Sequence, residues 1–99
     1  MPDKEYTVLL SADCRLVVSI RMAVGKVVSF VVRLVRTNDV IDEDVARYDT
    51  AHGAPHLDIL GPGGSLKQKI WLDVESFEEA LTLAIEDFKR NYESYLKKG

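Results

Sequence analysis

The chain's two histidines lie four residues apart, within a segment rich in groups that can donate or accept protons. Five side chains of this histidine segment, residues 47–58, have the chemistry of a catalytic site: Arg47, Tyr48, Asp49, His52 and His56. Gly53 and Pro55 separate the histidines and argue against a helix there. Functional groups are common on loops that a rigid scaffold positions, so we take this segment as the candidate functional site.

One chemistry open to the histidine segment is cleavage of RNA without a metal ion. That reaction needs a general base for the 2′-hydroxyl and a general acid for the leaving oxygen. Imidazoles suit both roles, because their reference pKa of about 6.5 lies near working pH. His52 and His56 would form the acid–base pair. A cation must also contact the phosphate, and Arg47, Lys67 or Lys69 could supply it.

Three further residues are expected to bind rather than react: Asp58, Lys67 and Lys69. The glycine- and proline-rich run at 61–64 predicts a tight turn between two short strands. A hairpin about that turn places Asp58 opposite Lys67 and His56 opposite Lys69, all on one face of the sheet. Asp58 could then orient a histidine or neutralise Lys67.

Two other interpretations of the histidine segment stay open at this stage. Its imidazoles and carboxylates are acceptable ligands for a divalent ion, but a four-residue spacing outside a helix is weak evidence, and we expect neither a metal nor a cofactor. The other interpretation is structural. In it Asp49 accepts backbone amides at a turn, Tyr48 packs beneath a helix, and the histidines bond to backbone groups.

The composition limits the class of protein more than its function. The chain has 99 residues, of which 46% are hydrophobic and 29% charged, as in one soluble globular domain. No apolar run approaches the length of a membrane span. The single cysteine, Cys14, cannot form an internal disulfide, which favours a reducing cytoplasm. A pI near 5.3 argues against a chain-wide nucleic-acid footprint, while a local patch keeps RNA as a candidate partner.

The hydrophobic pattern predicts strands over about residues 5–72 and one helix over about 76–96. Ser76 and Glu79 form a capping box at the start of that helix. No helix interrupts the strands, which favours one α+β domain over residues 1–99. Its antiparallel sheet of about five strands would be covered on one face by the C-terminal helix. The acidic run at 42–44 is expected in a loop, and residues 23–25 in a three-residue hairpin loop.

One helix of about 20 residues cannot cover both faces of such a sheet. The uncovered face would carry several apolar side chains, namely Val17, Val31, Val35 and Trp71. We therefore expect a homodimer or a small protein partner on that face or at a sheet edge. Arginines share this face, but no Tyr or Phe lies between them to stack bases, so a solvated or partner-covered surface is preferred to a phosphate-binding one.

The order of these features resembles the TumE-type toxin-like small proteins. The residues that carry the resemblance are Arg47-Tyr48-Asp49, His52-Gly53, His56-Leu57-Asp58 and, in the helix, Asp87-Phe88. The chain is also similar to a related uncharacterised family with a Tyr-Asp-Thr-Ala-His-Gly and Pro-His-Leu-Asp signature. The resemblance implies a small cytoplasmic interaction protein of a toxin–antitoxin system, with residues 47–58 as its functional loop. A metal-independent ribonuclease that uses the two histidines is the alternative.

Overall fold

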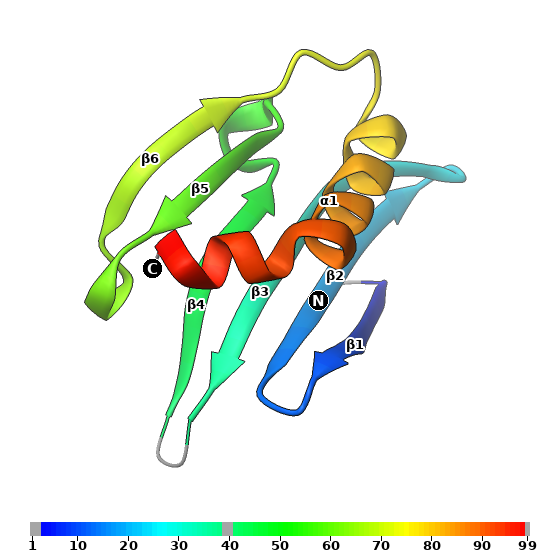
Figure 1. Cartoon of the computed structure of the whole chain (residues 1–99). Coiled ribbons are helices and arrows are strands. Elements are labelled where there is room, and N and C mark those ends of the chain that lie inside the picture. Colours follow the sequence, from blue (N-terminus) through cyan, green and yellow to red (C-terminus); the bar gives the residue numbers. More distant parts are fainter. Residues whose placement is uncertain (1–2, 39–40, 99) are drawn as a thin grey trace.

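The computed structural model describes residues 3–38 and 41–98, without the side chains of His52 and Lys98. Within these residues it contains one antiparallel sheet and one long helix (Figure 1). The six strands pair in chain order: β1 (Lys4–Ser11), β2 (Cys14–Ala23), β3 (Lys26–Thr37), β4 (Asp42–Asp49), β5 (His56–Leu60) and β6 (Leu66–Trp71). Short 3-10 turns, η1 (Ala51–Gly53) and η2 (Pro62–Gly64), follow β4 and β5, and α1 spans Phe77–Lys98. The α+β class is confirmed, with one strand more than expected.

Helix α1 packs on one face of the sheet, and the core lies between them. The alternating apolar residues of β2 and β3 point toward α1, which presents Ala80, Ala84 and Phe88, each 0% exposed. Two alanines let the helix approach the strands closely, and the Phe88 ring fills the remaining space. Burial of one such large apolar side chain contributes about 2–3 kcal/mol. The lone thiol of Cys14 belongs to the same core, as expected of a packing residue, and its burial raises the pKa of the thiol.

The loop between β2 and β3 contains two residues, Val24 and Gly25, rather than the expected three. Both have positive φ, 51° and 74°, as tight hairpin turns require. A two-residue loop alone would pair even-numbered with odd-numbered residues, but a bulge that leaves Val28 unpaired shifts the register by one. Ile20 therefore lies opposite Phe30, and the apolar sides of both strands face α1 as predicted.

Strand β4 begins at Asp42, so the prediction that residues 42–44 lie in a loop is wrong. These acids pair with the end of β3, and each meets an arginine: Arg15 with Asp42 at 2.7 Å, Arg36 with Glu43 at 3.8 Å and Arg33 with Asp44 at 2.8 Å. Acidic residues have low strand propensity, but opposite charges on neighbouring strands offset it. Arginines of β2 and β3 and acidic residues of β4 thus form a ladder of ion pairs.

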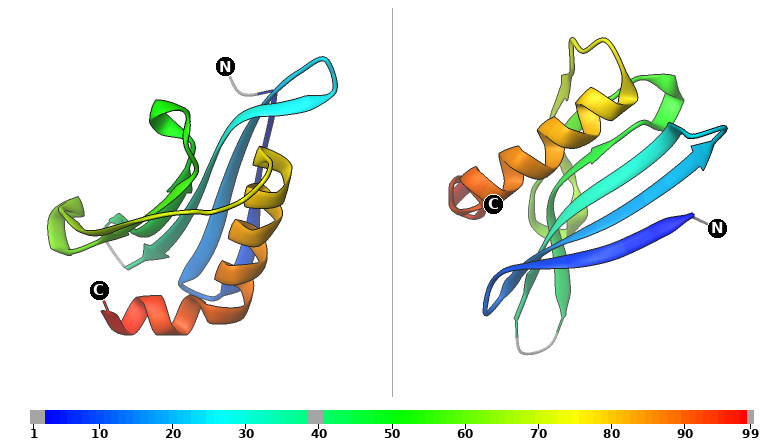
Figure 2. Two further views of the ribbon diagram at one scale, coloured as in Figure 1. Left: turned by 90° about the horizontal axis from the view of Figure 1, so that it is seen from above. Right: turned by 90° about the vertical axis from the view of Figure 1, so that its right-hand side faces the viewer.

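Helix α1 begins at the predicted position. The backbone amide of Glu79 donates a hydrogen bond to the Ser76 hydroxyl at 3.1 Å, and the Glu79 carboxylate accepts one from the backbone amide of Glu75 at 3.3 Å. Figure 2 shows that α1 is bent and lies on one side of the strands only. No helix among the described residues has the length and apolarity that a membrane span requires. The sheet face opposite α1, called the outer face below, carries the candidate site.

Candidate functional site

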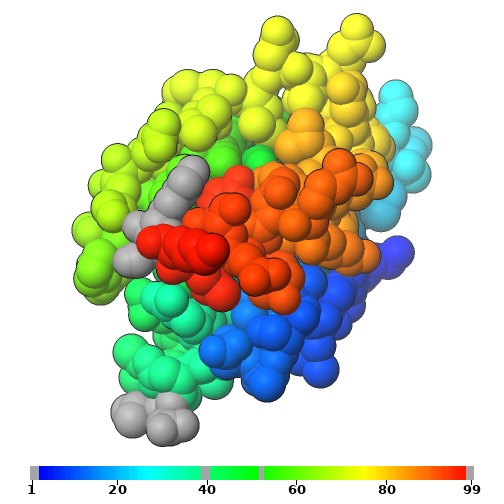
Figure 3. Space-filling model, viewed as in Figure 1, coloured from blue at the N-terminus to red at the C-terminus, as the bar shows by residue number. Residues whose placement is uncertain are grey.

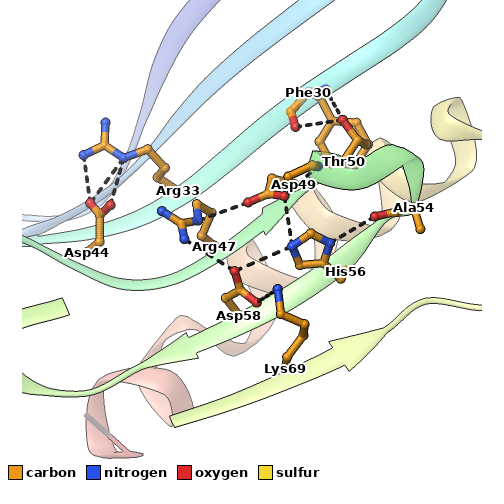
Figure 4. Close-up of polar contacts among 11 residues, drawn as sticks. Phe30, Arg33, Asp44, Arg47, Asp49, Thr50, Ala54, His56, Asp58 and Lys69 are labelled. Atoms are coloured by element: carbon orange, nitrogen blue, oxygen red, sulfur yellow. Dashed lines mark hydrogen bonds and ion pairs between the residues drawn. The ribbon is translucent and has the colours of Figure 1, made fainter. Parts of the chain in front are cut away.

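Two rows of cross-strand neighbours run over the outer face from β3 to β6. The first row is Arg33, Arg47, Asp58 and Lys69. The second row is Val31, Asp49, His56 and Trp71. Five of these side chains contact one another where the rows adjoin (Figure 4), and we call them the charge cluster: Arg47, Asp49, His56, Asp58 and Lys69. Antiparallel pairing of β4 with β5 brings them together, because directly opposite residues share a face.

His56 lies at the centre of the charge cluster and is 1% exposed. Its Nδ1 is 3.0 Å from the backbone carbonyl of Ala54. A carbonyl can only accept, so Nδ1 donates this hydrogen bond and carries a proton. The other ring nitrogen, Nε2, faces two carboxylates at once, at 3.0 Å from Asp49 Oδ1 and 3.6 Å from Asp58 Oδ2. The imidazole is therefore fixed in orientation from both sides.

Two cations hold the carboxylates from the far side. Arg47 contacts Asp49 Oδ2 through Nε at 3.1 Å and Asp58 Oδ2 through Nη2 at 3.4 Å, while Lys69 Nζ lies 3.0 Å from Asp58 Oδ1. Arg47 Nη2 donates a hydrogen bond to Asp58, but Arg47 Nε and Asp58 Oδ1 are buried without a directed hydrogen bond, so the Arg47 Nε–Asp49 and Lys69–Asp58 contacts are ion pairs only. Both cationic side chains keep about a third of their surface exposed, whereas the carboxylates are nearly buried. Burial of these acids is tolerated because each is paired.

The start of η1 is tied to the same cluster. Asp49 Oδ1 accepts a hydrogen bond from the backbone amide of Ala51 at 2.9 Å. The next residue, Thr50, is anchored to β3, since its hydroxyl accepts a hydrogen bond from the amide of Phe30 at 3.1 Å. This part of the structural interpretation is confirmed: Asp49 accepts a backbone amide at a turn.

Trp71 covers the imidazole from β6. The two ring centroids are 5.0 Å apart, and Lys69 Nζ lies 5.4 Å from the indole centroid. Even so, Trp71 is 57% exposed. The strand alternation predicts that Trp71 lies on the outer face, but the sequence did not indicate its contact with His56, which depends on the exact β5–β6 register.

That register differs from the predicted one by two residues. Asp58 lies opposite Lys69 and not Lys67, and His56 lies opposite Trp71. One residue of this difference arises at the turn, where Leu60 pairs with Leu66, and the other from a bulge at Lys67, which lies against Gly61. Lys67 is therefore outside the charge cluster.

Tyr48 lies on the opposite face from His56, because adjacent residues of a strand alternate. Its ring packs on Phe88 at 4.9 Å between centroids. The hydroxyl groups of Tyr48 and Tyr95 donate hydrogen bonds to the same oxygen of Asp87, at 2.7 and 2.5 Å. Burial, aided by the Asp87 carboxylate, raises the pKa of both tyrosines. Tyr48 therefore ties α1 to β4, and the structure does not bring it to the predicted catalytic group.

On the helix face, Tyr48 lines a cavity of about 700 Å³ along α1. Figure 3 shows this face, with α1 lying between β6 and the first strands. On the outer face, a second cavity of about 450 Å³ borders Asp49 and is lined by serines and Arg21. It gives solvent a path to one side of the charge cluster.

His52 lies in η1, and its side chain is outside the described part of the chain. The expected meeting of two imidazoles therefore stays a prediction, as does the ribonuclease that depends on it. A substrate could reach the His56 ring only after movement of its neighbours, because the ring is sealed. Three of the outer-face arginines, Arg15, Arg33 and Arg47, have acidic partners. Such pairing leaves little positive potential for a phosphate backbone.

A family model described as a domain of unknown function (DUF7718) matches residues 1–98, so the chain belongs to this family. No curated protein and no solved structure matches it.

Proposed function

We propose that this member of the DUF7718 family is a small interaction protein of the toxin–antitoxin type that binds a protein partner along β6. The observation that carries the proposal is the exposure of Trp71, 57%, on the edge strand of the sheet. Tryptophan is enriched among the residues that dominate binding energy at protein interfaces. A tryptophan without such a role is usually more deeply buried.

The edge position supports a partner that adds a strand. Strand β6 pairs with β5 alone among the described strands, and all of its residues are exposed. Apolar side chains stand on both of its faces, Ile70 toward α1 and Trp71 on the outer face. An unpaired strand edge offers backbone donors and acceptors to an extended segment, while alternate side chains give specificity.

The charges of β6 favour a partner different from the chain itself. The strand carries Lys67 and Lys69 and no acidic residue. A second copy of β6 pairing about Gln68 would place lysine opposite lysine, which is destabilising. The partner that fits is an extended strand with acidic and apolar residues in alternation, as a neutralising antitoxin could provide.

The histidine segment contributes to this function by holding β6. The charge cluster links β4, β5 and β6, and His56 supports the Trp71 ring from below. A rigid aromatic side chain loses little conformational entropy on binding, so this support increases affinity.

Co-expression with the product of the adjacent gene, followed by measurement of the complex Kd, tests the proposal. We expect Trp71→Ala to weaken the complex at least ~30-fold, the effect of losing an interface hot spot of about 2 kcal/mol. The matched control is Leu9→Ala on the opposite edge strand β1, where Leu9 is 78% exposed. This control should leave the Kd unchanged.

Two results would overturn the proposal. One is a complex that Trp71→Ala binds as tightly as the wild type. The other is a purified chain that forms a dimer in light scattering, which Trp71→Ala dissociates, since a second copy would then occupy β6. Cleavage of RNA by the wild type, lost in His56→Gln, would favour the ribonuclease alternative instead.

A further inference from the structure

The geometry of the charge cluster points to a binding site for a divalent transition-metal ion. We propose that His56 Nε2, Asp49 Oδ1 and Asp58 Oδ2 are its protein ligands. The potential ligand atoms of these three residues lie within 4.8 Å of one another. One nitrogen and two carboxylate oxygens form a ligand set that suits Zn²⁺, Mn²⁺ or Fe²⁺, and leaves coordination positions for water.

The orientation of the imidazole supports this site. Nδ1 donates a hydrogen bond to the carbonyl of Ala54, so Nε2 is the ring nitrogen whose electron pair a metal ion would take. Metal-binding histidines commonly make this hydrogen bond to a backbone carbonyl, because it fixes both the tautomer and the ring plane. Nε2 faces between the two carboxylates, which lie 3.0 and 3.6 Å away.

The remaining carboxylate oxygens are held by other groups. Arg47 Nε contacts Asp49 Oδ2, and Lys69 Nζ contacts Asp58 Oδ1, so the other oxygen of each acid faces the imidazole. Each of these ligand oxygens also has a second neighbour, the Ala51 amide for Asp49 Oδ1 and Arg47 Nη2 for Asp58 Oδ2. Partners of this kind orient metal ligands in proteins. The two cations are partly exposed, so water screens their repulsion of a bound ion. The buried Asp58 Oδ1 has an ion-pair contact but no directed hydrogen bond.

The spacing of the two histidines did not predict this ligand set. It depends on the pairing of Asp49 with His56 across β4 and β5, and on the position of Asp58 two residues beyond His56 on the same face. The cavity that borders Asp49 provides an entry path from the outer face. The three proposed ligands lie on β4 and β5 and none on β6, so a failure of metal binding would leave the proposed partner binding along β6 standing.

The test uses the full chain after dialysis against EDTA, with Zn²⁺ and Co²⁺ as probes. We expect Zn²⁺ to raise the melting temperature by about 5 °C or more at saturation. Co²⁺ should add visible absorption bands and quench the emission of Trp71, the chain's single tryptophan, which adjoins His56. Asp58→Asn should weaken the affinity for Zn²⁺ and for Co²⁺, measured by these responses, at least ~10-fold.

The matched control is Asp44→Asn, because Asp44 also pairs with an outer-face arginine but lies outside the ligand set. It should keep the wild-type response. If Asp58→Asn fails to fold, Asp49→Asn replaces it, and the Co²⁺ spectrum of the wild type remains decisive. The proposal is overturned if Zn²⁺ and Co²⁺ leave melting and emission unchanged up to about 1 mM, where even a millimolar site is half filled. An equal response in the ligand variant and the control would also overturn it.

Discussion

His56 is a buried polar side chain whose ring nitrogens both have partners. The sequence indicated its neighbours as candidate site residues, but strand alternation determines which of them lie on the same face as His56. Arg47 and Asp49 share a face with His56, whereas Tyr48, between them, faces the helix. Of the predicted residues of this segment, Arg47, Asp49, His56 and Asp58 meet in the charge cluster and Tyr48 does not, while the side chain of His52 lies outside the described residues. The segment up to residue 49 was predicted as a strand, so strand parity applied to it would have placed Tyr48 on the other face from Arg47 and Asp49.

Removal of one charge from the cluster should destabilise the fold. Asp58→Asn leaves Arg47 and Lys69 without their shared carboxylate, and we expect a loss of about 2 kcal/mol in the free energy of unfolding. Asp44→Asn should cost less than about 1 kcal/mol, since its ion pair with Arg33 is more exposed. Urea unfolding of both variants provides the comparison, and equal losses would contradict a special role for the cluster.

The buried tyrosines predict instability at alkaline pH. Folding raises the pKa of Tyr48 and Tyr95 above the ordinary value of about 10, because burial and Asp87 favour the protonated form. Their contribution to stability is complete below about pH 10. It falls at higher pH, as the unfolded chain loses these protons first.

Urea midpoints measured from about pH 8 to about pH 11 should therefore decrease above pH ~10. Tyr48→Phe should reduce that decrease, while Tyr6→Phe, an exposed residue on β1, should not. A midpoint that stays constant over this range would show that the two tyrosines titrate alike in both states.

At the scale of elements, the sequence predicted the helix, most of the strands and the core-facing side of β2 and β3. Periods of two and of three to four residues determine these features. It did not predict where bulges lie, because a bulge changes the register without changing the composition. The bulge at Val28 restored the predicted facing of β2 and β3, whereas the turn and the bulge at Lys67 together changed the partner of Asp58 from Lys67 to Lys69. The ion pairs of β4 were likewise decided by cross-strand partners.

The β2–β3 turn offers a test of the local backbone. Val24 has a φ of 51° and is 100% exposed, so a β-branched residue occupies a left-handed position with no compensating packing. Val24→Asn should stabilise the fold by about 1 kcal/mol, because Asn-Gly is the preferred pair for this turn. Val28→Asn, an exposed strand residue, serves as control and should not stabilise. A Val24→Asn variant less stable than the wild type would contradict the turn geometry.

At the scale of the whole molecule, the fold is an open sheet with one helix, and so it has one bare face and two edges. The outer face is covered largely by its own ion pairs, which leaves the β6 edge as the surface best suited to a partner. Size and the single helix were enough to predict that a surface would remain uncovered. The sequence alone could not identify β6 as the binding edge. That choice depends on the contact between Trp71 and His56, which follows from the register of β5 and β6.

Hydrogen exchange of the backbone amides tests this account most directly, with the chain measured alone and together with the product of the adjacent gene. The account predicts slower exchange of the β6 amides in the mixture, while those of the opposite edge strand β1 remain unchanged. Protection that appears on β1 or α1 and leaves β6 as it was would contradict the claim that partners bind along β6.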